Sequence, residues 1–158
     1  MDLTSPPAAS ESDYWWLVFH EKSSLPWLWW LGRFKHVSAF TYVGGFRMWE
    51  VYDVQNHRTR ILRFAYDEWV RRGYPEWTRD AVVVKFHVKP AERTRIASRF
   101  FFFCGPAIKH LVGLRCLALR PDAIYRQVIR AGGQPIVNQD AADSGRSESG
   151  AREGAGRG

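Results

Sequence analysis

The sequence predicts an α+β domain in which helices pack on an antiparallel sheet of about four to six strands. Three observations predict it. Short runs rich in aromatic and β-branched residues, typical of strands, fill the first half of the chain and return at 81–88. Glycine or asparagine turns separate consecutive runs, which favours hairpins. Two helix patterns, each with a proline in its first turn, follow at the C-terminal end of the domain.

The first strand is expected at 14–20 (YWWLVFH), which is short, aromatic and β-branched. A turn and one or two helical turns are expected at 23–34 (SSLPWLWWLGRF). Two further strands, 35–43 and 46–55, follow in the chain. Because Gly44-Gly45 lies between them, we expect a tight two-residue hairpin there.

A third strand of this meander is expected within 56–66, after the polar turn that begins NHR. The stretch 67–73 starts like a helix and ends at a glycine. A strand at 81–88 (AVVVKFHV) is closed by a proline two residues later. Two helices, in 104–114 and 120–133, complete the domain, the second with an apolar face and a glycine stop.

One domain is expected at 14–137, between two disordered tails. The chain has 158 residues, of which 46% are hydrophobic and 15% aromatic, enough for one core. Residues 1–13 and 138–158 are small, polar and poor in apolar side chains. Burial therefore cannot offset their ordering entropy, which predicts disorder.

Composition sets aside several classes of protein. No run of about 18 apolar residues is present, so no membrane-spanning helix is expected. The N-terminus MDLTSPPAASESD lacks the basic and apolar regions of a secretory signal, so synthesis in the cytoplasm is expected. Two cysteines without zinc-ligand spacing predict neither a disulfide scaffold nor a metal site, and no cofactor is expected.

The charge is concentrated in the body of the chain. The net charge is +7, but both tails are acidic, so residues 14–138 carry about +11. A basic body suits nucleic acid or an anionic surface. The arginines are scattered rather than striped, and no RRM, helix-turn-helix or zinc pattern is present, which argues against a nucleic-acid binder. A solvated arginine surface is the simpler interpretation.

Cys104 is the first candidate for chemistry. It follows the apolar run RFFFF and precedes a helix start, Gly105-Pro106. A cysteine at this place meets the unpaired N–H groups and the positive end of the helix dipole, which favour the thiolate. The alternative is a free cysteine that serves as a small core residue.

A cysteine nucleophile needs a histidine and a group that orients it. His36 begins a strand, and in the next strand Trp49, Val51 and Asp53 share one face. With a hairpin closed at Gly44-Gly45, Asp53 would pair with residues 36 and 37, beside the His36 ring.

The remaining histidines are less suited to this role. His110 follows Cys104 on the same helix and would point away from the helix start, and His57 lies in a polar turn. His20 and His87 lie in or at the end of strands and stay open as alternatives.

The order of these motifs resembles a known fold. A strand with HVSAF, a strand with WEVYD and a helix in FFCGPAIKHLVGL, followed by RCLALRPDAIYRQV, are similar to motifs of small uncharacterised proteins from bacteria and their phages. Those proteins resemble the circularly permuted papain-like fold of the NlpC/P60 superfamily. The similarity covers about 14–130, in pieces. It implies Cys104 as nucleophile, His36 as base and Asp53 as orienting residue.

The resemblance implies a cysteine-dependent hydrolase or acyltransferase, peptidase-like or amidase-like, that acts on a peptide, amide or ester. Two departures from the family pattern, Phe103 and Gly105-Pro106, motivate an alternative: a non-catalytic structural or assembly protein on the same fold, for example a phage virion component. Partners are a separate question. Trp27, Trp29 and Trp30, beside basic residues, suit a protein partner or a membrane surface, although a core role is the simpler interpretation.

Overall fold

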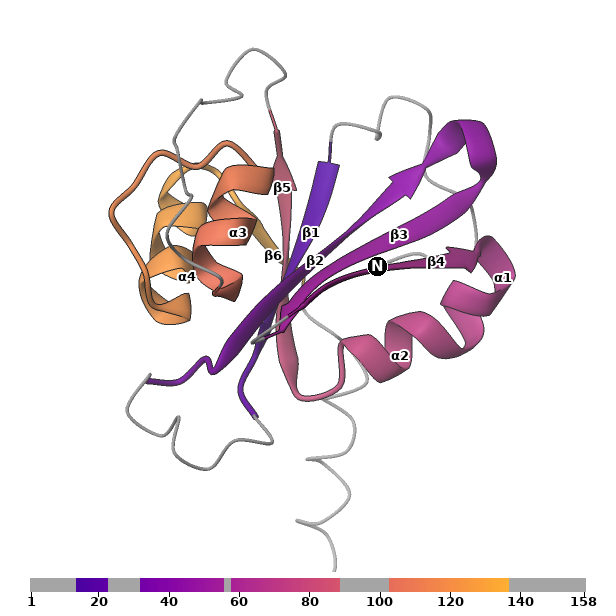
Figure 1. The fold of residues 1–158 in the computed structure, drawn as a ribbon, viewed down its shortest axis with the longest axis horizontal. Coiled ribbons are helices and arrows are strands. Elements are labelled where there is room, and N and C mark those ends of the chain that lie inside the picture. Colours follow the sequence, from indigo (N-terminus) through magenta and orange to yellow (C-terminus); the bar gives the residue numbers. More distant parts are fainter. Residues whose placement is uncertain (1–13, 23–31, 56–57, 89–102, 137–158) are drawn as a thin grey trace, which may run out of the picture.

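An antiparallel sheet of six strands runs through the centre of the protein, with helices on both of its faces (Figure 1). This computed structural model describes residues 14–22, 32–55, 58–88 and 103–136. The strand order across the sheet is β4-β3-β2-β1-β5-β6, and every neighbouring pair is antiparallel. The expected α+β class with an antiparallel sheet is therefore confirmed.

The strands are β1 (Tyr14–His20), β2 (His36–Val43), β3 (Met48–Gln55), β4 (Arg58–Ala65), β5 (Ala81–His87) and β6 (Gln134–Ile136). The helical segments are the 3₁₀ turn η3 (Gly44–Phe46), the consecutive α1 (Tyr66–Glu68), η4 (Trp69–Gly73) and α2 (Tyr74–Trp77), and the helices α3 (Cys104–Leu111) and α4 (Pro121–Arg130). Within the described residues, no helix is long and apolar enough to cross a membrane.

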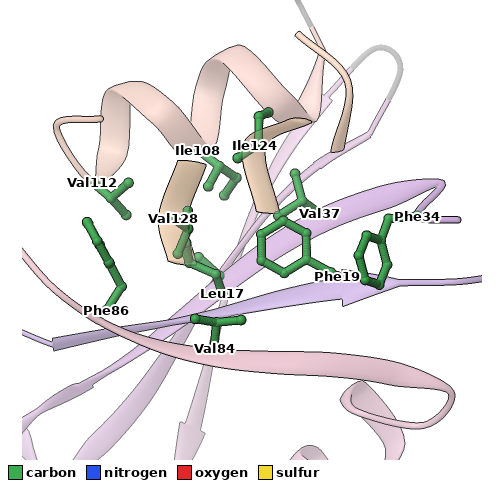
Figure 2. Packing of buried hydrophobic residues seen from close by; sticks show 11 residues of the cluster. Leu17, Phe19, Phe34, Val37, Val84, Phe86, Ile108, Val112, Ile124 and Val128 are labelled. Atoms are coloured by element: carbon green, nitrogen blue, oxygen red, sulfur yellow. The ribbon is translucent and has the colours of Figure 1, made fainter. Parts of the chain in front are cut away.

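One core lies between the sheet and the helices α3 and α4. Figure 2 shows Ile108 of α3 and Ile124 of α4 among side chains from the sheet, including Leu17 and Val37. All four side chains are fully buried. Burial of such a side chain contributes about 1.5–3 kcal/mol each, so this core fixes α3 on the sheet.

A second, aromatic core lies on the opposite face, under the α1–α2 segment. Its centre is formed by Trp16, Phe40, Trp49 and Trp69, all fully buried. The Trp16 and Phe40 rings stack at 5.7 Å, and the Phe40 and Trp69 rings approach to 4.8 Å. Aromatic pairs add about 0.5–1.5 kcal/mol beyond the area that they bury, so these contacts hold the segment against the sheet.

Residues 66–77 form one helical run that contains a π-helical turn, η4. The prediction that this helix ends at Gly73 was wrong, because Gly73 has helical dihedral angles and the run continues to Trp77. A Cβ at Gly73 would lie 2.4 Å from a ring carbon of Trp69. The glycine therefore makes room for an indole inside the helix and does not stop it.

One other expectation about the sheet needs correction, and one strand was not predicted. The turn between β2 and β3 holds four residues, Gly44–Arg47, and Arg47 adopts a left-handed conformation with φ 51°. The short edge strand β6 was not predicted, because three residues with a proline carry little pattern. The expected helical turns with Trp27, Trp29 and Trp30 lie outside the described residues, as do both tails.

We predict that Gly73→Ala lowers the free energy of unfolding by about 1–3 kcal/mol, because the new methyl group overlaps the Trp69 ring. Denaturant unfolding followed by tryptophan fluorescence measures the change. The matched control is Gly45→Ala, where a Cβ meets nothing within 4 Å. Equal stability of the two variants would contradict the packing role of Gly73.

Candidate active site

The candidate site lies where the pairing of β2 with β3 stops. The β2–β3 register runs from Val43↔Met48 to Ala39↔Tyr52. Beyond that point, β2 continues beside β1 as far as His36, and β3 continues beside β4 as far as Gln55. The ends of the two strands are thus held by their outer neighbours. Helix α3, which begins at Cys104, contacts both strands.

Asp53 lies level with Ser38, one step beyond the last β2–β3 pair, and not opposite 36 and 37 as expected. The four-residue turn moves the register by two residues. Since side chains alternate with a period of two, this shift leaves Asp53 on the same face as His36. The two residues become diagonal neighbours and still reach each other: His36 Nε2 donates to Asp53 Oδ1 at 2.6 Å.

The Asp53 carboxylate is buried and uses both of its oxygens. Its side chain is only 3% exposed, against 28% for His36. Gln55 Nε2 donates to Oδ2 at 2.9 Å, and Arg60 is its partner on β4. Burial raises the pKa of Asp53, but the hydrogen bond and charge of His36, with Gln55 and Arg60, outweigh it and lower the pKa. The group is therefore an anion at neutral pH.

Cys104 occupies the first position of α3, where Phe103 is the extended N-cap. Burial raises the pKa of the Cys104 thiol, but hydrogen bonds from the His36 ring and from the N–H groups of Val37 and Gly105 lower it on balance. Gly105 makes this placement sterically feasible. A Cβ there would lie 2.7 Å from both the Leu119 carbonyl oxygen and an Ile124 methyl group.

His36 joins the other two residues. Its Nε2 is bound to Asp53, which leaves Nδ1 as the ring nitrogen for Cys104. Burial lowers the pKa of His36, but the hydrogen bonds and charges of Asp53 and Cys104 raise it to about 9. The Cys104 pKa is lowered at the same time, so both shifts favour the thiolate–imidazolium pair over the neutral pair.

The structure brings the three sequence-predicted residues together at the junction of β2, β3 and α3. Of the other histidines, His87 packs against Tyr14 at the far end of β1, and His110 is exposed near the end of α3. His57 lies outside the described residues. Among the residues that the structure describes, no group of three His, Cys, Asp or Glu side chains could hold a metal ion.

The sequence left His20 open as a base, and the structure places it beside His36 on the neighbouring strand. The two rings stack at 5.5 Å with 27° between their planes. Ser38 and Trp77, to which His20 is linked by hydrogen bonds, were not predicted for the site. Gln55 was not predicted either. Gln55 lies two residues after Asp53 in β3, so the two side chains share one face of the strand, and this spacing could have indicated Gln55.

We predict that Asp53→Asn lowers the pKa of His36 by about one unit or more from its value of about 9, because the buried negative charge is lost while the side-chain shape is kept. NMR titration of the His36 ring measures the change. His110→Ala, an exposed change on α3, serves as control. A His36 pKa that stays at about 9 in the Asp53→Asn protein would show that Asp53 does not set it.

Comparison with protein-family models, curated proteins and solved structures gives no match for this chain. The site is therefore assigned from its own geometry: a cysteine at a helix start, a histidine that bonds it, and a buried carboxylate that bonds the histidine.

Proposed function

We propose that this protein is a cysteine-dependent hydrolase or acyltransferase that acts on an amide or ester by a Cys104/His36/Asp53 mechanism. The observation that carries the proposal is that one histidine bonds the buried carboxylate of Asp53 at 2.6 Å and also bonds Cys104. Activated cysteine nucleophiles show this arrangement of nucleophile, base and orienting group. A cysteine used only for packing needs neither partner.

In the first half of the reaction, the Cys104 thiolate attacks the substrate carbonyl carbon and a C–S bond forms. The Cys104 N–H, at the first position of α3, is the donor for the negative charge that develops on the carbonyl oxygen. Of the next three residues, Gly105 bonds the sulfur, Pro106 has no N–H, and Ala107 donates to the Phe103 carbonyl. The His36 imidazolium then gives its proton to the leaving nitrogen or oxygen as the C–N or C–O bond breaks. An acyl-enzyme thioester remains.

In the second half, neutral His36 takes a proton from the acceptor, which then attacks the thioester carbonyl. Water as acceptor gives hydrolysis, and an alcohol or amine gives acyl transfer. The C–S bond breaks and the thiolate is restored beside the imidazolium. Asp53 stays ionised throughout and fixes the ring so that the other nitrogen faces the sulfur.

The chain order supports a second, structural part of the proposal. The histidine strand β2 and the carboxylate strand β3 precede the cysteine helix α3. This order resembles the circularly permuted papain-like fold of the NlpC/P60 superfamily, and we propose that assignment. A virion location and docking to a protein or membrane surface remain proposals that follow from the same resemblance and from the tryptophans at 27, 29 and 30.

We predict that p-nitrophenyl acetate acetylates Cys104 faster than Cys116, because hydrogen bonds from His36, Val37 and Gly105 lower the thiol pKa of Cys104. Intact-protein and peptide mass spectrometry locate the acetyl group over time. Cys104→Ala should abolish the fast phase, and Cys116→Ala, the matched control, should keep it. Equal and slow labelling of both cysteines in the folded protein would exclude the hydrolase and favour the non-catalytic alternative.

The pH dependence separates the roles of the two titrating groups. For an alkyl amide or alkyl ester, kcat/KM should rise through the lowered pKa of Cys104, below the value of about 8.5 for a free thiol. It should fall as His36 loses its proton at a pKa of about 9. A p-nitrophenyl ester, whose leaving group needs no proton, should keep the rise and lose the fall. The same bell shape for both esters would contradict His36 as the acid.

A further inference from the structure

A second histidine supports the site from the strand on its other side. His20 ends β1 and is the direct partner of His36 in the β1–β2 register. β1 is paired on both sides, since His20 is also level with Ala81 of β5. The His20 backbone is therefore fixed from two directions, and its ring stacks on the His36 ring at 5.5 Å. His36 thus lies between His20 on β1 and Asp53 on β3.

The orientation of the His20 ring is set by a hydrogen-bonded chain. Trp77 Nε1 donates to Ser38 Oγ at 2.9 Å, and Ser38 Oγ lies 3.0 Å from His20 Nε2. An indole N–H can only donate, so the serine oxygen accepts from it. Ser38 is fully buried, so its hydroxyl links the Trp77 indole to the Nε2 of His20 without competition from solvent.

Burial and the charge of His36 together keep His20 neutral. Burial and the positive charge of His36 lower the pKa of His20 to about 4, while the charge of Asp53 partly opposes them. The charged neighbours in sequence, Glu21 and Lys22, form exposed ion pairs with Arg33 and Asp80. An uncharged ring can lie against the His36 imidazolium, whereas a second imidazolium at this distance would repel it.

The π-helical turn η4 explains how Trp77 reaches the sheet. A π turn adds one residue to the helical repeat, which rotates the following residues by about 100° around the axis. Trp77 lies four residues beyond Gly73, the last residue of η4. Its indole is then directed at Ser38, 39 residues earlier in the chain. The aromatic core that holds Trp69 therefore also fixes Trp77, the last residue in the series of hydrogen bonds that begins at His20.

We infer that His20 is a positioning residue: Ser38 and Trp77 hold its ring flat against His36, so that the two His36 nitrogens stay directed at Asp53 and Cys104. A role of His20 in turnover rests on the proposed function. The positioning of His36 also sets the pKa of the Cys104 thiol, which is measured without a substrate. A His36 ring free to turn would bond the thiolate for less of the time, and the thiol pKa would rise.

The experiment replaces His20 by an aromatic or by an aliphatic residue. It uses the full chain with Cys116→Ala, so that Cys104 is the one cysteine left. His20→Phe keeps a ring against His36, and His20→Leu fills similar space without one. The pH dependence of iodoacetamide alkylation gives the Cys104 pKa, and denaturant unfolding gives the stability. We expect His20→Phe, which keeps a ring against His36 but loses the Ser38 hydrogen bond, to raise the Cys104 pKa only slightly, as for Ser38→Ala below. His20→Leu should raise the Cys104 pKa by about one unit, a tenfold loss of thiolate below that pKa.

Ser38→Ala provides a second, milder variant that keeps the His20 ring but removes its tether, and a smaller rise in the Cys104 pKa is expected. His110→Ala is the control and should change neither readout. An unchanged Cys104 pKa in both His20→Leu and Ser38→Ala, with or without a loss of stability, would overturn the positioning role while leaving the proposed function intact. Failure of the proposed function is a different result: Cys104 of the parent protein would show no lowered pKa at all.

Discussion

The hydrogen bond between His36 and Asp53 depends on the place where two strands of one sheet separate. β2 and β3 pair up to Ala39↔Tyr52, and their ends are then held by β1 and β4. A continued ladder would leave no place for a third element between the strands. Because the ladder stops, the first residue of α3 meets the backbone of β2 at Val37 and the ring of His36. The site is thus a consequence of how the sheet ends.

Two cores on opposite faces of the sheet supply the rigidity that such a site needs. The aliphatic core seats α3 through Ile108 and allows its first turn to approach at Gly105. The aromatic core holds the helical run that ends at Trp77, which reaches the site from the other face through Ser38. Residues directed to the nucleophile therefore come from both sides of the sheet. Preorganisation of this kind keeps groups within reach without ordering them during the reaction.

The charges at the site are mutually dependent. Asp53 is buried, and His36 and Cys104 are partly buried. Burial alone would favour a neutral thiol, a neutral imidazole and a protonated carboxyl. Hydrogen bonds and neighbouring charges reverse the direction of all three pKa shifts, because each group provides the partner that stabilises the charged form of the next. His20, next to this set, keeps the opposite state: it is partly buried beside the His36 cation and stays neutral. Two adjacent histidines with the same side chain thus differ in charge because different groups surround them.

The sequence by itself determined the α+β class, the strand β1 and the two C-terminal helices, because these follow from periodicity and from proline at helix starts. It also singled out Cys104, His36 and Asp53, through the helix start after residue 103 and the alternation of side chains along a strand. Tertiary structure alone decided the turn length after β2, the continuation past Gly73 and the pairing of His20 with His36. The physical reason is the distance along the sequence over which each feature is decided. Local patterns determine which residues form an element and which face they share. The pairing of His20 with His36 across a 15-residue connection, and the space for the Trp69 indole at Gly73, depend instead on packing between distant segments.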